Sequence, residues 1–236
     1  MADYTNMADY YDIIMTSGYY DYDSIVKSIL HFQEGQNILE IGCGTGLILE
    51  QLVKQKKFHK VTGMDLTKAM LEIADERLKD FDNVCLFQQN IVTLSLMDKY
   101  DMAFSYGGVW YFFVDDNELF LVSHLSNHTD NQKGLEQLSK HINSRGKLLL
   151  GIQGPHYDYE KTISNGMLYS QKITSTDYGF IKDYYLSNND KIVMSQTINY
   201  RVYSFDDAVK LLADYGFEYQ PVREIKDNLF IEFKKL

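Results

Sequence analysis

The residues that most clearly could do chemistry in this chain are a cluster of glycines and one acid. Gly42, Gly44 and Gly46 follow the apolar segment 38–41. Asp65 lies 19 residues after Gly46, at the end of a second apolar segment. Glycines permit a tight turn and let a ligand lie against bare backbone, while free N–H groups at a helix start favour an acceptor. A carboxylate at this distance can accept both ribose hydroxyls of a nucleoside. Glycine turns also occur in plain strand-to-helix connections, but the added acid favours nucleoside binding.

Alternating strand and helix patterns surround these residues. Short buried strands are predicted at 37–41, 61–65, 84–87, 101–105 and 147–152, with helical spacing of apolar residues between most of them. Such alternation implies a parallel sheet with helices on both faces. Ligands bind outside the carboxyl ends of the strands in open sheets of this kind, and both the glycine loop and the acid fall there.

The pattern changes in the second half of the chain. Residues 167–203 alternate Thr, Tyr, Ile and Val with polar residues, which predicts antiparallel hairpins with a turn at 187–190. Ser204 begins a capping-box-like helix start, and 229–233 is typical of a closing strand. Residues 113–133 stay open, because 119–125 fits either an inserted strand or a helix.

The glycine loop and the segment around the acid resemble a known family. Residues 40–46, Glu-Ile-Gly-Cys-Gly-Thr-Gly, are similar to the first motif of class I S-adenosylmethionine (SAM)-dependent methyltransferases, E/D-x-G-x-G-x-G. Residues 63–71 resemble the second motif, with an acid closing the strand and a Met-Leu pair one turn into the helix. Tyr11-Asp12 followed by Asp21-Tyr22, and hairpins before a final helix and strand, resemble small-molecule N-methyltransferases acting on amino sugars.

This resemblance implies the fold and the cofactor. We expect an α/β, Rossmann-like class I methyltransferase sheet, mostly parallel with an antiparallel final strand, and an antiparallel hairpin insert that forms a lid. Residues 1–236 would form a single methyltransferase domain, with an N-terminal helical cap at about 1–34 and the hairpin insert at about 165–203. SAM would be the cofactor and S-adenosylhomocysteine (SAH) the product.

The resemblance also implies which residues bind the cofactor. The loop residues Gly42, Cys43, Gly44 and Gly46 would pass beneath the methionine part, and Asp65 would hold the ribose. The remaining cofactor residues would be Leu66, Met70, Asn90 and Ile91 around the adenine, Ser105 facing the sulfur, and Tyr11, Tyr19 and Tyr20 near the carboxylate. Asn90 departs from the family's usual Asp, although its amide oxygen can still accept from the adenine amine. Each tyrosine also fits simple packing of a terminal helix on the core.

Methyl transfer requires a positioned nucleophile that can lose a proton. The reaction is an in-line displacement at a sulfonium methyl, so positioning is the main task. His156 follows the strand at 147–152 at the binding end of the sheet and is the first candidate for a base, with a solvated loop histidine as the alternative. Tyr106, next to Ser105 after the fourth strand, would face the sulfur. Tyr106 and Trp110 could also stack on a substrate or surround a cationic amine.

The other histidines favour simpler roles. His124 and His128 lie in the open segment 113–133 and are predicted to be solvated. His141 comes late in a predicted helix and can stabilise that terminus.

Composition limits the partners. Lys and Arg number 23 against 33 Asp and Glu, a net charge of −10, which argues against binding a phosphate backbone. No N/D-P-P-Y/F-like tetrapeptide follows the fourth strand, so we expect no nucleic acid partner. Two cysteines without C-x-x-C spacing, and no H-E-x-x-H helix, indicate no metal. With no secretory leader or long apolar segment visible, we expect a cytoplasmic protein without membrane contact.

Three functions remain open at this stage. The first is a SAM-dependent methyltransferase acting on the nitrogen or oxygen of a small molecule. The second is a non-catalytic SAM-binding regulator. The third is an NAD-dependent oxidoreductase, against which the short spacing before the third glycine argues. The acceptor and the oligomeric state, with a homodimer as one alternative, also stay open.

Overall fold

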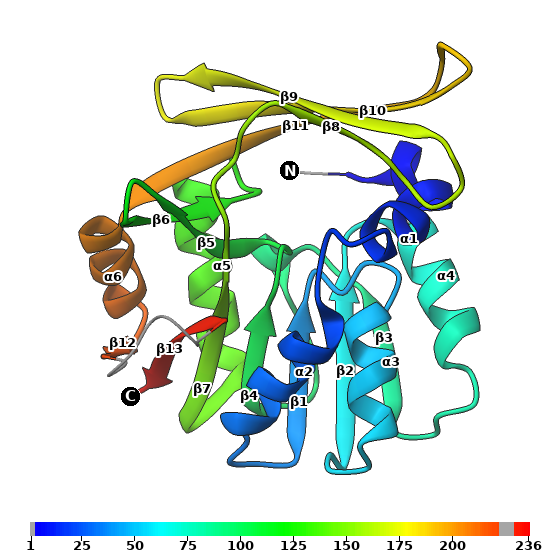
Figure 1. The fold of residues 1–236 in the computed structure, drawn as a ribbon. Helices are drawn as coiled ribbons and strands as arrows, with labels where there is room; N and C mark the ends of the chain where they lie inside the picture. Colours follow the sequence, from blue (N-terminus) through cyan, green and yellow to red (C-terminus); the bar gives the residue numbers. More distant parts are fainter. Residues whose placement is uncertain (1–2, 222–228) are drawn as a thin grey trace.

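A mostly parallel sheet forms the base of the molecule in the computed structural model, which describes residues 3–221 and 229–236 (Figure 1). Its parallel strands, in the order β3-β2-β1-β4-β7, are β3 (Val84–Gln88), β2 (Lys60–Asp65), β1 (Asn37–Ile41), β4 (Tyr100–Ser105) and β7 (Ile142–Gln153). Antiparallel β13 (Phe230–Lys235) pairs with β7, and β12 (Phe217–Gln220) pairs with β13. The predicted α/β class with an antiparallel final strand is confirmed.

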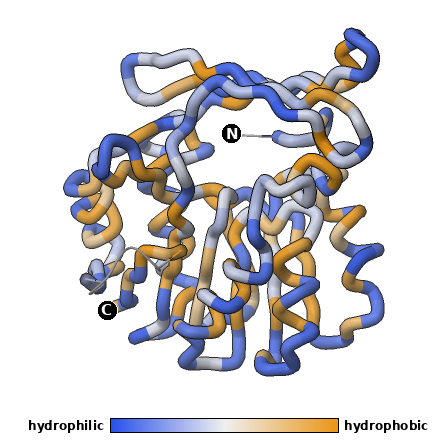
Figure 2. The backbone as a smooth tube through the Cα atoms, in the orientation of Figure 1, coloured by the Kyte–Doolittle hydropathy of each residue, from blue (hydrophilic) through white to orange (hydrophobic). Residues whose placement is uncertain are grey.

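Helices bury both faces of this sheet. The first face carries α2 (Tyr22–His31), α3 (Leu47–Lys54) and α4 (Lys68–Leu78), and the second carries α5 (His128–His141) and α6 (Phe205–Asp214). Successive strand residues point to opposite faces. Ile38 therefore packs in the cluster with α2, α3 and α4, and Leu39 packs in the cluster with α5 and α6. Figure 2 shows the apolar positions concentrated in this base and a more hydrophilic layer above it.

That upper layer is an antiparallel lid beyond the carboxyl ends of the parallel strands (Figure 1). Its strands are β5 (Trp110–Asp115), β6 (Glu118–Ser123), β8 (Tyr159–Thr162), β9 (Leu168–Thr176), β10 (Gly179–Asn188) and β11 (Lys191–Ser204). They continue from β7 in the order β5-β6-β11-β10-β9-β8. The predicted hairpin lid is confirmed, and the turn at 187–190 has Asn189 and Asp190 at positive φ. The open segment 119–125 supplies a strand, β6.

Two local features set the ends of the helices near the site. The helix α5 ends at His141, and Ile142 begins β7 by pairing with Tyr100. The helix α4 begins after Thr67, whose hydroxyl accepts from the Tyr4 N–H at 3.1 Å. The strand β12 was not predicted.

The N-terminal residues lie between the lid and the base (Figure 1). A short helix η1 (Thr5–Met7) leads into α1 (Ala8–Thr16). Met7, Ile14 and Met15 are buried in a cluster made mainly of lid residues. None of the helices in the described ranges has the length and apolar character needed to span a bilayer.

A buried asparagine joins α5 to the first hairpin of the lid. The Asn131 Oδ1 accepts from Trp110 Nε1 at 2.7 Å and from Ser123 Oγ at 2.6 Å. Its Nδ2 donates to the carbonyl oxygens of Leu125 and Asn127 at 2.7 and 2.9 Å. The Asn131 side chain is fully buried, and its amide oxygen accepts two hydrogen bonds while its amide nitrogen donates two.

We expect Asn131→Ala to lower the free energy of unfolding by about 2–4 kcal/mol, because the buried donors of Trp110 and Ser123 lose their acceptor. Urea unfolding followed by the fluorescence of Trp110, the chain's one tryptophan, measures this. The exposed Asn188→Ala is the control and should change stability by less than about 0.5 kcal/mol. Equal stability of the two variants would contradict the structural role of Asn131.

Candidate active site

The glycine loop joins β1 to α3 in a backbone conformation that residues with a side chain rarely adopt. Gly42, Gly44 and Gly46 have φ values of 75°, 53° and 79°. The N–H groups of Gly42 and Cys43 both donate to the Met64 carbonyl oxygen, at 2.8 and 3.0 Å, which holds the loop against β2. A Cβ added to Gly42 would stand 2.9 Å from the Cα of Gly108. The loop therefore needs glycine both for its φ angles and for close packing.

The carboxylate of Asp65 organises the backbone around the end of β2. Its Oδ2 accepts from the Gly44 N–H at 2.9 Å, and its Oδ1 accepts from the Thr67 N–H at 2.8 Å. Burial raises the pKa of Asp65 above its ordinary value, and these backbone hydrogen bonds partly oppose that rise. Each carboxylate oxygen keeps a second acceptor site, so the group can still receive hydroxyls from a ligand.

A cavity lies between this loop, helix α1 and the lid. Most of the predicted cofactor residues line it: Tyr11, Tyr19, Tyr20, Gly42, Gly44, Asp65, Leu66, Met70 and Ile91. The candidate base His156 lines it as well. The structure thus brings together residues from the N-terminal helix, the carboxyl ends of the parallel strands and the loop after β7.

The other predicted cofactor residues lie outside that lining. Cys43 borders a smaller void beneath the loop, and Gly46 is the N-cap of α3, packed against α4. The Asn90 side chain accepts from the Val92 N–H at 2.9 Å and caps the short helix η2 (Ile91–Thr93). Ser105 is completely buried, and its hydroxyl has no hydrogen-bond partner within the described chain.

Tyr106, the second catalytic candidate, also points away from the cavity. Its ring packs edge-on against Tyr20 and Phe230, with centroid distances of 5.3 and 5.4 Å. Gly151 allows this placement, because a Cβ there would lie 2.4 Å from the Tyr106 ring. Tyr106 borders the smaller void together with Cys43, so the structure gives no support to its predicted contact with the reacting atoms.

His156 is held by aromatic side chains at the cavity wall. Its Nε2 lies 3.1 Å from the Tyr111 hydroxyl, and its ring centroid lies 5.2 Å from those of Phe113 and Phe180. Burial, helped by the charge of Lys182, lowers the pKa of His156 to about 3. The imidazole is therefore neutral at physiological pH, and burial keeps the Tyr111 phenol protonated by raising its pKa. The His156–Tyr111 pair therefore carries no charge, but it can donate a hydrogen bond to a ligand or accept one from it.

His124 is a correction to the sequence analysis, which placed it in solvent. The side chain is only 7% exposed and lines the cavity, with its ring 4.8 Å from that of Tyr200. Burial lowers its pKa to about 3, and nearby Lys182 adds to the effect. Because the sequence left 119–125 open between a strand and a helix, it did not show that His124 is buried against the cavity. His128 is exposed as predicted, and His141 Nδ1 lies 2.8 Å from the Gln137 carbonyl oxygen in the last turn of α5.

Sequence reasoning also missed the residues that the lid contributes. Lys182 and Tyr184 of β10 and Tyr200 of β11 line the cavity together with Tyr4. The signal was present, because inward positions in a strand recur every second residue and the apolar Phe180 and Leu186 share the face of Lys182. The alternation alone did not show that this face covers a ligand site.

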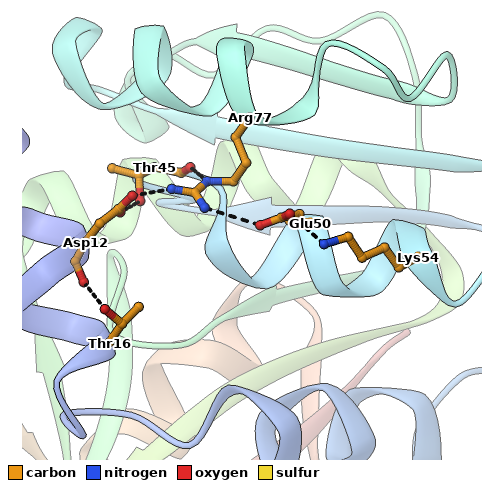
Figure 3. Close-up of polar contacts among 6 residues, drawn as sticks. All are labelled: Asp12, Thr16, Thr45, Glu50, Lys54 and Arg77. Atoms are coloured by element: carbon orange, nitrogen blue, oxygen red, sulfur yellow. Dashed lines mark hydrogen bonds and ion pairs between the residues drawn. The ribbon is translucent and has the colours of Figure 1, made fainter.

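A polar network fastens α1 to the glycine loop (Figure 3). Asp12 of α1 accepts from the Thr45 hydroxyl at 2.6 Å and pairs with Arg77 of α4. Arg77 also donates to the Thr45 carbonyl oxygen at 2.8 Å and pairs with Glu50 at 3.2 Å. Lys54 completes the network by pairing with Glu50 at 2.6 Å. These contacts set the position of the N-terminal helix over the cavity.

Comparison with known proteins agrees with this geometry. A sequence model described as a methyltransferase domain matches residues 38–142. The uncharacterized methyltransferase YdaC of Bacillus subtilis is 30% identical over 140 residues, which cover 58% of this chain and 68% of that protein. This chain belongs to the class I SAM-dependent methyltransferases.

Other similar proteins are more distant or match over a shorter part. Malonyl-[acyl-carrier protein] O-methyltransferase 1 of Ilyobacter polytropus is 34% identical over 89 residues. The matched residues make up 38% of this chain and only 32% of that methyltransferase. The structure of Streptomyces venezuelae DesVI has a TM-score of 0.71 at 14% identity, with 97% of both chains covered. A SAM-dependent methyltransferase from Clostridium acetobutylicum has a TM-score of 0.69 at 17% identity, with 99% and 98% covered. The two structures share the fold.

SAM is the cofactor of this methyltransferase family, and the cavity fits it. The half-buried carboxylate of Asp65 borders the cavity and retains acceptor capacity for a ribose. Gly44 also lines the cavity, and because it has no side chain, a ligand there can lie directly against the backbone.

We expect Asp65→Ala to weaken SAH binding by about 2–3 kcal/mol, because hydrogen bonds to a charged group contribute about 1.5–3 kcal/mol. Calorimetric titration of the methyltransferase with SAH measures the loss. The exposed Asp177→Ala in the lid is the control and should bind SAH as the wild type does. Unchanged affinity in Asp65→Ala would refute the assignment of this carboxylate to the cofactor.

The buried His124 also predicts a pH dependence of stability. Its folded-state pKa of about 3 lies below its ordinary 6.5, so the unfolded chain binds a proton between these values that the folded chain does not. The free energy of unfolding therefore falls as the pH falls below 6.5, by about 2 kcal/mol at pH 5 for this one group. Urea unfolding at pH 7.5 and 5.0 should show a smaller difference in His124→Gln. An identical difference in both proteins would contradict the burial of a neutral imidazole.

Proposed function

We propose that this methyltransferase transfers the methyl group of SAM to the nitrogen or oxygen of a small molecule held under the lid. When bound, SAM supplies an electrophilic methyl group on a sulfonium. Asp65 binds the ribose hydroxyls, and the backbone of Gly42 and Gly44 lies against the methionine part. Leu66, Met70 and Ile91 provide the apolar surroundings of the adenine, since all of them line the same cavity.

The observation that carries this proposal is the composition of the cavity roof. The lid contributes Tyr184, Tyr200 and His124 to the cavity lining, and the loop after β7 contributes His156. These residues form an aromatic ceiling, whereas the glycine loop and Asp65 form the cofactor floor. Aromatic faces attract a cationic amine, and neutral phenols orient polar groups by hydrogen bonds. A roof of this kind favours a small acceptor over a nucleic acid, in line with the net charge of −10.

In this proposal His156 orients the acceptor together with Tyr111. A pKa of about 3 makes the imidazole a poor base for an ammonium or a hydroxyl, because the proton would return at once. Its neutral ring can still accept a hydrogen bond and hold the reacting group in line. An amine acceptor agrees with this geometry, because an amine can lose its proton to water before it attacks.

We expect His156→Ala to lower turnover about ten- to a hundred-fold while SAH affinity stays within about two-fold, because misplacing a reacting group by 1 Å can cost about 10² in rate. The assay follows labelled methyl transfer from SAM to the small molecules of a bacterial extract, with calorimetry for SAH. The exposed His128→Ala is the matched control. Wild-type turnover in His156→Ala would end the orienting role.

The regulator remains the second candidate function, because an enclosed SAM site does not by itself require turnover. Formation of SAH together with a labelled small molecule separates the two functions. SAH binding without any labelled product, across extracts of several growth conditions, would favour the regulator.

A further inference from the structure

The lid carries a buried lysine that the steps above do not use. Lys182 lies in β10, a strand of the upper layer in Figure 1, on the same face as Phe180 and Tyr184. Lys182 and Tyr184 line the cavity from this face. Only 2% of the residue is exposed. Lysines are almost never fully buried unless they are paired.

Within the described residues, the amine of Lys182 makes its hydrogen bond and its cation–π contacts with tyrosines. Its Nζ donates to the Tyr19 hydroxyl at 3.2 Å and lies 4.8 Å from the centroid of the Tyr184 ring. In residues 3–221 and 229–236 no carboxylate lies within ion-pairing distance of it. Lys147, the other buried lysine in these ranges, pairs with Glu34 at 2.9 Å and with Glu232 at 3.3 Å. Lys182 thus faces the cavity without a carboxylate partner, and burial lowers the pKa of its amine to about 7. An anion bound beside the amine would favour its protonated form.

The groups around Lys182 are donors or neutral rings. Burial raises the pKa values of Tyr19 and Tyr184, so both keep their protons. His124 and His156 are neutral for the opposite reason, since burial lowers their pKa values. Asp65, the only carboxylate among the described residues that line the cavity, accepts hydrogen bonds from backbone N–H groups at the floor. This end of the cavity offers one amine and several hydroxyl donors, which is the chemistry of an anion site.

We propose that Lys182 and the Tyr19 hydroxyl bind an anionic group, a carboxylate or phosphate, of the methyl acceptor. The proposal rests on the proposed function, since it concerns the acceptor of that reaction. An anion also fits the charge balance, because the sulfonium and ammonium of SAM outnumber its single carboxylate. The acceptor is therefore an amine or alcohol that also carries a carboxylate or a phosphate.

The alternative source of an anion is the carboxylate of SAM itself. Tyr11 and Tyr20 are the N-terminal tyrosines that lie against the loops of the floor, near Gly44 and Gly107. The Tyr19 ring packs edge-on against Tyr20, with a centroid distance of 4.9 Å, and against Tyr169 of the lid at 6.2 Å. Tyr19 thus lies between the floor and the lid, and Lys182, on the lid strand β10, bonds it from the ceiling. We assign the cofactor carboxylate to Tyr11 and Tyr20.

The test begins with the wild-type protein, so it does not depend on a variant that folds. Small molecules of a bacterial extract are methylated with labelled SAM, and the product is applied to an anion exchanger at pH 8. We expect the labelled product to be retained and to be released by salt. A labelled product that passes through unretained would overturn the proposal while leaving methyl transfer intact. SAH binding with no labelled product would instead refute the proposed function, and this inference with it.

Two variants then assign the anion to Lys182. We expect Lys182→Met to form labelled product at least ten-fold more slowly with SAH affinity unchanged, and Lys172→Met, on the exposed face of the neighbouring lid strand, to behave as the wild type. Wild-type product formation in Lys182→Met would overturn the proposal. A ten-fold loss of SAH affinity, with 5′-methylthioadenosine affinity unchanged, would assign the lysine to the cofactor carboxylate and also overturn it.

Discussion

A chain of hydrogen bonds that starts at one half-buried carboxylate links the sheet to the lid. Asp65 accepts from Gly44 and Thr67, which fixes the glycine loop and the start of α4 relative to β2. The Thr67 hydroxyl accepts from the backbone of Tyr4, and the Tyr4 hydroxyl lies 3.0 Å from that of Tyr200 in the lid. The hydrogen bonds that begin at Asp65 therefore connect the glycine loop, the N-terminal segment and the lid strand β11.

The N-terminal helix is held at two separate places, and this explains how a segment outside the sheet can complete the site. At one end the Tyr4 contacts hold the segment, and along α1 the pair of Asp12 with Arg77 does so. Arg77 is only partly exposed and bonds Thr45 in the glycine loop, so the pair is better shielded than an ordinary surface ion pair. The tyrosines that follow Asp12 reach the cavity as a result. The N-terminal segment thus contacts both the glycine loop, at the floor of the cavity, and the lid, at its ceiling.

The parts that could be predicted from sequence are those that local chemistry defines. The glycine loop and Asp65 lie on consecutive strand–loop–helix units, so their spacing alone indicates where they meet. Lys182 and His124 reach the cavity only because β10 and β6 pair with β11 in the lid, at separations that no local pattern encodes. Tyr106 follows β4 as predicted, but its ring packs in the space that Gly151 leaves, so its role in the reaction stays a prediction. Topology can be inferred from periodicity, whereas the direction of a side chain depends on its neighbours in space.

The strand β7 belongs to both layers, and this has a mechanical consequence. Its middle pairs with β4 and β13 in the base, and its last residues Ile152 and Gln153 pair with Phe112 and Phe113 of β5 in the lid. The inner edge of the lid is thus joined to the base by backbone pairing. A rigid rotation of the whole lid away from the base would have to break these pairs, so the lid is anchored where β5 meets β7.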